Sequence, residues 1–430
     1  MKLKFLLSIL LIPIFSAVFS QNENLAFAVT GQSLSNLKWT DIRVIDMTTG
    51  NTNATLFENG KTKFSFLDAL TNKPVNELTV SGNPARLQQI GLGITANQNI
   101  INNPSPTQLM SAAMAYDKMH NKLFFASMFT GQLNWLDLQS NKTEPVFYSI
   151  QKPLLNNVDY NDESFNITRM TIGADGYGYA LTNDGNHLIQ FTTGSKTIIA
   201  DLGSLIDDES NSNISVHNKC ISWGGDIVGD AFGKLYLLSA GKSVFIIDPK
   251  TMVATYKGTI SNLPATFSLN GAAVIDDNNV MISCANTLDG YYKVDVNQLL
   301  AVKISTQGTV YNASDLASCN LLHEQEKINS LGIPILPNAE VSGNRIISIY
   351  PNPVSDGQIK ITFESNESGT YKIALTDLQG RVIGTKDVFI KGPGQVENFQ
   401  LRTKQASGMY LIKITDAANK SIYSDKLVLE

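Results

Sequence analysis

Consecutive carboxylates are the residues of this sequence whose type and spacing best fit a chemical role. Asp207, Asp208 and Glu209 stand side by side, and a Ser-Asn-Ser-Asn stretch follows them. Carboxylate and amide oxygens are the ligands that Ca²⁺ prefers, so the run is a candidate calcium site. It lacks the Gly and the terminal Glu of an EF-hand loop, which favours a solvated loop. The sequence indicates no other cofactor.

Signatures of catalysis are scarce. The sequence contains no Gly-x-Ser-x-Gly elbow, no phosphate-binding Gly-x-x-x-x-Gly-Lys-Ser/Thr loop and no Cys-x-x-Cys. The run from His323 to Lys327 has Lys where a zinc protease needs its second His, and four histidines leave few for a metal centre. Polysaccharide hydrolases work with two carboxylates, whose separation a sequence does not show. These observations weigh against an enzyme without deciding the question.

Composition and charge limit the class of protein. The chain has 430 residues, of which 43% are hydrophobic and 17% are charged, and its net charge is −5. A charged fraction below the usual ~25%, with many turn-forming residues, favours β-structure. An acidic chain without basic runs makes nucleic acid an unsuitable partner. The three cysteines allow either one disulfide and one thiol or three thiols.

Residues 1–20 have the pattern of a secretory signal peptide. Lys2 and Lys4 precede an apolar stretch over residues 5–15, and Ser20 offers a cleavage site. The stretch is short against the ~20 residues of a spanning helix, and no later segment approaches that length. We therefore expect export and a mature chain that does not span a membrane.

A repeated double hairpin fills residues 21–322. Four segments place an Asp in the turn between two apolar runs, and each is followed by a second hairpin-like unit; the turn residues are Asp117, Asp175, Asp230 and Asp276. Two hairpins per ~45–58 residues form a four-stranded propeller blade. We predict a β-propeller of about six blades, closed by a strand near Ala26 or near Tyr311; a large β-sandwich is the alternative. The segments loosely resemble secreted bacterial propellers of the quinoprotein-like and YVTN-like kind.

The periodicity stops over residues 323–345, which we interpret as a linker, and a new all-β segment occupies residues 346–430. Seven strands are predicted there, and Ile359, Ile361 and Phe363 fall on one face of the second strand. An immunoglobulin-like sandwich of seven strands fits this pattern.

Four motifs in this segment carry a family resemblance. They are Tyr350-Pro351-Asn352-Pro353, Leu378 to Val382 around Gly380, Gly408 to Ile414 around Tyr410, and Lys426 to Leu429. In order, spacing and position, the segment resembles the type A C-terminal sorting domain of cargo for the type IX secretion system of Bacteroidetes. The resemblance implies recognition by the type IX translocon, cleavage by its sortase before Pro351, and delivery through the periplasm to the outer surface or the medium.

The motif residues also have direct physical interpretations. Pro351 and Pro353 stiffen a bend, and Gly380 suits a turn with positive φ. At Gly408 a side chain would collide with its surroundings. Tyr410, Ile412 and Ile414 share one face of a strand.

Three functions are compatible with these features. The first is a surface or secreted propeller that binds a glycan, polymer or protein through its axial loops. The second is an exported polysaccharide hydrolase or lyase that uses carboxylates near the axis. The third is a structural component of the cell envelope or gliding apparatus. Acidic side chains converging in an axial pocket would favour the second, and a wide polar channel would favour the first.

Overall fold

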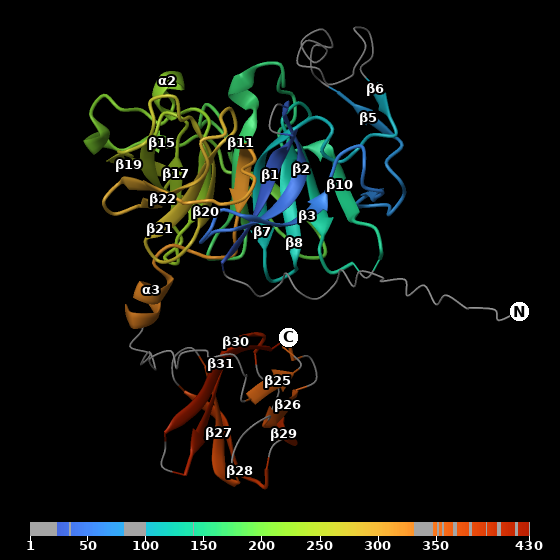
Figure 1. Cartoon of the computed structure of the whole chain (residues 1–430), viewed down its shortest axis with the longest axis vertical. Helices are drawn as coiled ribbons and strands as arrows, with labels where there is room; N and C mark the ends of the chain where they lie inside the picture. Colours follow the sequence, from blue (N-terminus) through green and yellow to red (C-terminus); the bar gives the residue numbers. More distant parts are fainter. Residues whose placement is uncertain are drawn as a thin grey trace, which may run out of the picture. The chain divides into compact units, whose positions relative to one another are not determined.

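We analysed a computed structural model of the chain (Figure 1). It describes residues 24–33, 36–80, 100–140, 142–330 and 347–429, the last range with gaps at 351, 355–356, 364–367, 378–380, 393, 402–405 and 418–419. The expected signal peptide lies outside these residues. Among the helices described, none is long and apolar enough to cross a membrane. The chain divides into two compact units, at residues 1–327 and 328–430.

Five sheets of four or five strands make up the first unit, and we number them as blades in chain order. Blade 1 contains β24 (Ala313–Ala317), β1 (Leu25–Ser33), β2 (Asn36–Asp46) and β3 (Thr52–Phe57). Blade 2 contains β4 (Ser65–Asp68), β10 (Val146–Pro153), β9 (Gln132–Asp137), β8 (Lys122–Ser127) and β7 (Ser111–Asp117). Blade 3 contains β11 (Ile167–Ile172), β12 (Gly178–Thr182), β13 (Leu188–Phe191) and β14 (Ile199–Asp201).

Blade 4 contains β15 (Ile206–Asp207), β19 (Val253–Thr259), β18 (Ser243–Asp248), β17 (Leu235–Leu238) and β16 (Asp226–Gly229). Blade 5 contains β20 (Leu269–Val274), β21 (Asn279–Cys284), β22 (Tyr292–Asp295) and β23 (Leu300–Lys303). A separate pair is formed by β5 (Glu77–Thr79) and β6 (Ile100–Asn102). Short helical turns are η1 (Glu163–Phe165), η2 (Glu209–Asn211) and α2 (Lys219–Ser222).

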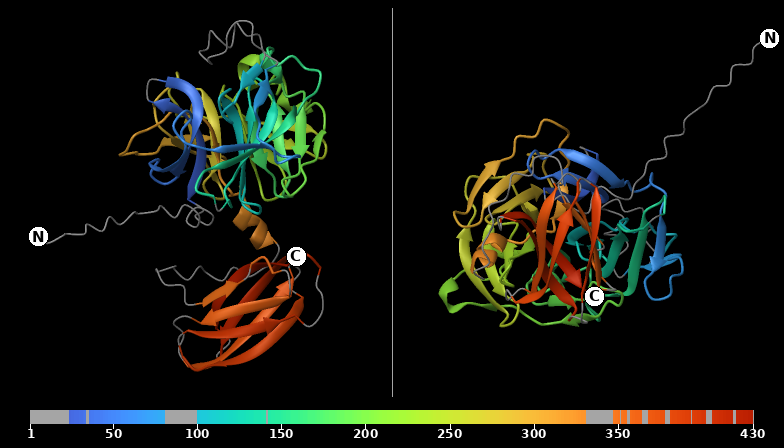
Figure 2. Two further views of the ribbon diagram at one scale, coloured as in Figure 1. Left: turned by 90° about the vertical axis from the view of Figure 1, so that its right-hand side faces the viewer. Right: turned by 90° about the horizontal axis from the view of Figure 1, so that it is seen from below.

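One strand of each blade belongs to a closed inner ring. β7 lies against β11, β11 against β16, β16 against β20, β20 against β24, and β24 against β7. The blades follow one another around this axis, as the colours in the right-hand view of Figure 2 show. Sheets of antiparallel strands arranged as blades around a central axis are the architecture of a β-propeller. The predicted propeller is therefore confirmed.

Both strands considered for closing the ring take part in it. β1 pairs with β24, with Phe27 opposite Ala317 and Ala28 opposite Leu316. Blade 1 thus combines three strands from the start of the unit with one from its end. This pairing joins the two ends of the unit within one sheet.

The expected count of about six blades is not confirmed, because the described residues form five. The repeat is indistinct from Lys61 to Gln108; residues 81–99 of this segment lie outside the described residues, and the described ones form no further four-stranded sheet. The segment adds β4 to the outer edge of blade 2, parallel to β10, and forms the small β5–β6 pair.

The repeated aspartates mark the turns between strands. Asp117 accepts hydrogen bonds from the N–H groups of Met119 and His120, and Asp230 accepts them from Phe232 and Lys234. A carboxylate that binds backbone N–H groups two to four residues onward fixes a tight turn. The sequence repeat is therefore a repeat of turn chemistry.

The first unit ends in helix α3 (Glu324–Ser330), inside the segment expected to be a linker. Asp277 accepts hydrogen bonds from the N–H groups of Gln325 and Glu326, and its own carbonyl accepts one from His323. The His323 ring is buried against the hydroxyl of Tyr236. A capped helix start and a buried side chain attach residues 323–327 to the propeller.

The second unit is a sandwich of two antiparallel sheets. One contains β25 (Ile347–Tyr350), β26 (Gln358–Phe363) and β29 (Gln395–Gln400). The other contains β28 (Val382–Ile390), β27 (Gly369–Asp377), β30 (Gly408–Asp416) and β31 (Ser421–Leu429). Ile359, Ile361 and Phe363 are all buried in the core between the sheets, as the alternation predicts. The seven-stranded sandwich is confirmed.

Because β20 and β24 pack closely in the inner ring, we expect a side chain at Gly271, on β20, to destabilise the propeller. A Cβ there would lie 2.6 Å from the carbonyl carbon of Asp315 and 2.6 Å from the N of Leu316, which are backbone atoms of β24. Gly271→Ala should lower the free energy of unfolding by about 1–3 kcal/mol in urea denaturation. Gly194→Ala is the matched control, because its nearest neighbour is the His120 ring at 3.7 Å. Equal losses in both variants would contradict the proposed closeness of β20 and β24.

Candidate functional site

Two carboxyl groups meet at the axis of the propeller. Asp226 begins β16, Asp315 lies on β24, and each is 0% exposed. Asp226 Oδ2 accepts a hydrogen bond from Ala272 N at 2.8 Å, and its Oδ1 accepts from Ile227 N at 2.7 Å and Met170 N at 3.4 Å. Asp315 Oδ1 accepts from Leu316 N at 2.6 Å, and the N–H of Met114 also points to this carboxyl.

These donors belong to β7, β11, β16, β20 and β24, so every inner strand gives a backbone N–H to the pair. An inner strand has one edge toward the axis, where its polar groups need partners. The two carboxyls supply these partners.

Burial raises the pKa of Asp226 and of Asp315, and the neighbouring Asp226 raises that of Asp315 further. Asp315 Oδ2 receives no hydrogen bond from a donor in the described part of the chain. An oxygen that carries the proton and donates it to Asp226 fits this environment.

A buried arginine accompanies the carboxyl pair. Arg169 on β11 donates to the carbonyl oxygens of Thr182 and Gly224 at 3.0 and 2.9 Å and also to those of Asn183 and Ser222. Burial lowers the pKa of Arg169, and the charge of Asp226 opposes that shift. Arg169 thereby ties blade 3 to the loop that leads into blade 4.

The axis has little free space beside these groups. A cavity of about 10 Å³ lies among the inner strands, bordered by Met114, Met170, Ile227, Ala272 and Leu316. Such a volume holds about one water molecule. The acidic side chains converge as the hydrolase hypothesis requires, but they are enclosed and bound to backbone N–H groups, so a sugar ring has no access to them.

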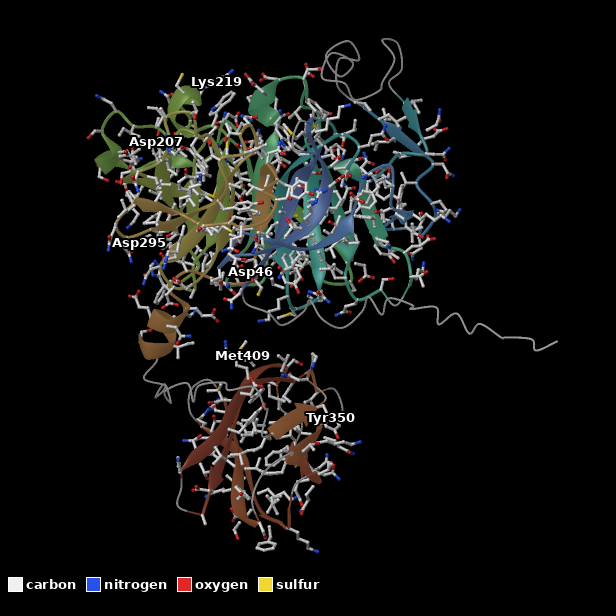
Figure 3. The ribbon with its side chains drawn as sticks, viewed as in Figure 1. Asp46, Asp207, Lys219, Asp295, Tyr350 and Met409 are labelled. Atoms are coloured by element: carbon white, nitrogen blue, oxygen red, sulfur yellow. The ribbon has the colours of Figure 1, made fainter. Side chains whose placement is uncertain are left out.

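The candidate calcium ligands do not converge. Asp207 ends β15 at the outer edge of blade 4 (Figure 3), and its Oδ1 accepts from Val216 N at 2.8 Å. Asp208 caps η2 through Ser210 N and also accepts from Thr255, while Glu209 is exposed. Across the described residues, no three His, Cys, Asp or Glu side chains gather as a metal site would require. Their observed role is to shape the loop.

A groove of about 780 Å³ separates the outer parts of blades 2 and 3. Its apolar lining comes from both blades and from the loop between them: Trp135, Ile150, Leu154, Leu155, Val158 and Ile199. Leu70, just after β4, borders it and is 79% exposed. Mostly apolar concave sites with a few polar groups are the usual form of ligand sites.

Two of the three charged side chains of the groove are cationic. Lys152 and Lys196 line it, and neither forms an ion pair with any described residue. The acidic residue Asp201 is engaged by His187, with 2.8 Å between His187 Nδ1 and Asp201 Oδ2. The groove therefore presents two lysines and one carboxylate, a formal net charge of +1, beside an apolar surface.

Sequence reasoning missed both the carboxyl pair and the groove. Asp226 and Asp315 each lie on an inner strand, directly before residues that border the small axial cavity. An apolar residue is usual at such a buried position. Aligning the blade repeats at their turn aspartates would have shown Asp226 where two other repeats have Ala113 and Ala272. No sequence signal identifies Lys152, His187 or Lys196, because the groove arises from the packing of two blades.

In the second unit, the predicted motifs at the two ends meet. Asn352 Nδ2 donates to the carbonyl of Lys426 at 2.9 Å, and Asn352 Oδ1 accepts from Val428 N at 2.9 Å. After Pro353, Val354 N donates to the carbonyl of Val428 at 2.8 Å. The Asn352 amide thus pairs with β31 as a backbone unit would, and it holds the last strand in place.

The remaining motif residues take several positions. Tyr410, Ile412 and Ile414 are buried on one face, and the Tyr410 hydroxyl donates to the carbonyl of Ala406 at 2.8 Å. The side chains of Tyr350 and Lys426 are exposed, and Tyr350 is labelled in Figure 3. Pro351 and Gly380 lie outside the described residues.

At Gly408 the expected steric collision is wrong, because a Cβ would meet no atom within 4 Å. The glycine is used for its backbone conformation, which has a φ of +155°.

Comparison with protein families decides the nature of this unit. The family model described as a secretion system C-terminal sorting domain matches residues 348–430. Residues 348–430 are a type IX sorting domain. The protein is therefore exported by type IX secretion to the cell surface or beyond it. No curated protein sequence matches the chain.

Several solved structures are similar to this chain at low sequence identity and low TM-score. PorZ, a surface component of the type IX secretion system of Porphyromonas gingivalis, is 12% identical, with 94% of this chain and 51% of that chain covered and a TM-score of 0.27. The extracellular domain of a one-component system from B. thetaiotaomicron is 10% identical, with coverages of 91% and 47% and a TM-score of 0.27. A Lactobacillus plantarum protein is 11% identical, with coverages of 88% and 99% and a TM-score of 0.35. The chain spans about half the length of the first two.

The carboxyl pair predicts a specific pH dependence. Both carboxyl groups have a raised pKa in the folded protein, so the pair's contribution to stability is complete below the unfolded pKa of about 4. As pH rises above that value, the contribution decreases by up to ~1.4 kcal/mol for each pH unit and each carboxyl group. Asp315→Asn keeps a donor toward Asp226 and an acceptor for Leu316 N, so it should fold and show a weaker loss between about pH 4 and pH 8.

Asp226→Asn is the contrasting variant. Its amide NH₂ would face backbone N–H donors, which should lower the free energy of unfolding by about 1–3 kcal/mol at every pH. Urea denaturation across the pH range measures both variants. An unchanged pH slope in Asp315→Asn would contradict the protonated pair.

The sorting domain offers a second prediction at Asn352. Asn352→Ala removes both side-chain bonds to β31 and should destabilise the domain by about 1–2 kcal/mol, with faster hydrogen exchange at Val428. Asn398→Ala, at an exposed position in β29, is a control within the same domain. Retained protection of Val428 in Asn352→Ala would show that Asn352 does not hold the strand.

Proposed function

We propose that the exported propeller is a non-catalytic binding protein and that the groove between blades 2 and 3 is its ligand site. The observation that carries this proposal is the combination of about 780 Å³ of space, an apolar lining and two lysines that form no ion pair with a described residue. At the axis, where the sequence suggested a ligand site, the cavity among the inner strands measures only about 10 Å³, which favours the groove as the site.

The chemistry of the groove selects its ligand. Lys152 and Lys196 favour negative charge, whereas Leu70, Val158 and Ile199 favour apolar contact. Neutral ligands gain nothing from the lysines, and strongly hydrated polyanions gain little from the apolar surface. An anionic polymer with apolar faces, either an acidic glycan or an acidic polypeptide, satisfies both.

The test is binding by the full-length chain to immobilised acidic polypeptides, polygalacturonate and their neutral counterparts. Lys152→Glu combined with Lys196→Glu should weaken binding of the acidic ligands by about tenfold or more. Lys250→Glu, an exposed lysine after β18, carries the same charge change outside the groove and should leave binding unaltered. Unchanged binding in the double variant, a preference for neutral ligands, or no binding by any member of the panel would contradict the proposal.

A further inference from the structure

The outer edges of the blades are completed in different ways. In blade 2, β4 runs parallel to β10, and Ala69 N donates to the carbonyl of Ser149 at 2.9 Å. In blade 4, β15 runs parallel to β19, and Ile206 N donates to the carbonyl of Met252 at 2.8 Å. Each of these blades therefore carries a fifth, parallel strand on its outside.

Blade 3 has no such strand among the described residues. Its outermost strand, β14, pairs only with β13 there. Thr192 N donates to the carbonyl of Ile198, and Leu202 N donates to that of Leu188, so residues 198 and 202 turn their backbone groups toward β13. By the alternation of an antiparallel pair, Ile199 and Asp201 turn theirs outward. An open edge of this kind is a template for a further strand.

The groove lies beside this open edge. Ile199 and Asp201 of β14 line it on one side, and Leu70 and Lys152 line it on the blade 2 side. A fifth strand on β14 would direct alternate side chains into the groove. Ile198, next to β14, is 59% exposed, which is unusual for a large apolar side chain next to a strand of a folded blade.

The other four-stranded blades offer less. β23 of blade 5 is bordered by Ser261, whose N donates to the carbonyl of Leu299 and whose carbonyl accepts from Ala301 N. β3 of blade 1 pairs with β2 through two register breaks. β14 is thus the outer edge that combines a regular backbone with a groove.

We propose that a partner protein binds by adding an extended acidic segment to β14 as a fifth strand, parallel to it as β4 and β15 are to their neighbours. Of the side chains that the segment directs into the groove, at every second position, apolar ones contact Ile199 and Leu70, and acidic ones pair with Lys152 and Lys196. Strand addition obtains affinity from main-chain hydrogen bonds and specificity from alternate side chains. This inference rests on the proposed function of the groove and names its ligand as a polypeptide.

The experiment uses the full-length protein and a blocked synthetic peptide of about eight residues, in which valine and glutamate take turns at every second position and threonine fills the positions between them. Two derivatives carry N-methyl groups on alternate amides, one set on each edge of the extended peptide. Since only one edge faces β14, one derivative should bind at least about tenfold more weakly than the parent, and the other should bind normally. Bound parent peptide should slow hydrogen exchange at Ile199 and Asp201.

Other outcomes separate this inference from the function on which it rests. If both methylated peptides bind as the parent does, or if Ile199 and Asp201 gain no protection, strand addition is wrong. Binding that still depends on Lys152 and Lys196 would then leave the groove as the ligand site. If polygalacturonate binds through these lysines and the peptide does not, the ligand is a glycan and the inference is overturned. Peptide binding that is insensitive to both lysines would contradict the proposed function itself.

Discussion

Unpaired strand edges are the constraint on which this propeller depends. Each blade has one edge at the axis and one at the rim, and both carry N–H and C=O groups that need partners. At the axis, Asp226 and Asp315 accept hydrogen bonds from all five inner strands, and burial keeps their pKa values raised. At the rim, β4 and β15 cover two blades, and the open β14 leaves the groove. The stability of the ring and the proposed binding site thus follow from one requirement.

The sequence allowed the local features to be predicted because their causes are local. Asp117 and Asp230 repeat because each binds the N–H groups of its own turn. Ile359, Ile361 and Phe363 alternate because one face of β26 is buried. Features that join distant segments were not predicted: the pairing of Asp226 with Asp315, the place of Lys152 opposite Lys196, and the number of blades. These depend on which blades become neighbours, and no short pattern records that.

Export and binding are assigned to units with separate cores. The core of the sorting domain consists of residues from Ile347 to Leu429, whereas the propeller clusters contain residues only up to Leu322. Asn352 stabilises the end of the chain within the sorting domain. The sorting domain and the propeller thus each have a core of their own.

Hydrogen exchange of the free, full-length protein tests the edge argument most directly. The amides of Met170, Ala272 and Leu316, which point to the carboxyl pair, should be protected. Ala69 and Ile206, which bond across to β10 and β19, should be protected as well. Ile199 and Asp201 should exchange rapidly. Slow exchange at Ile199 and Asp201 in the absence of any ligand would show that the rim of blade 3 is already covered, and the account of the groove would fail.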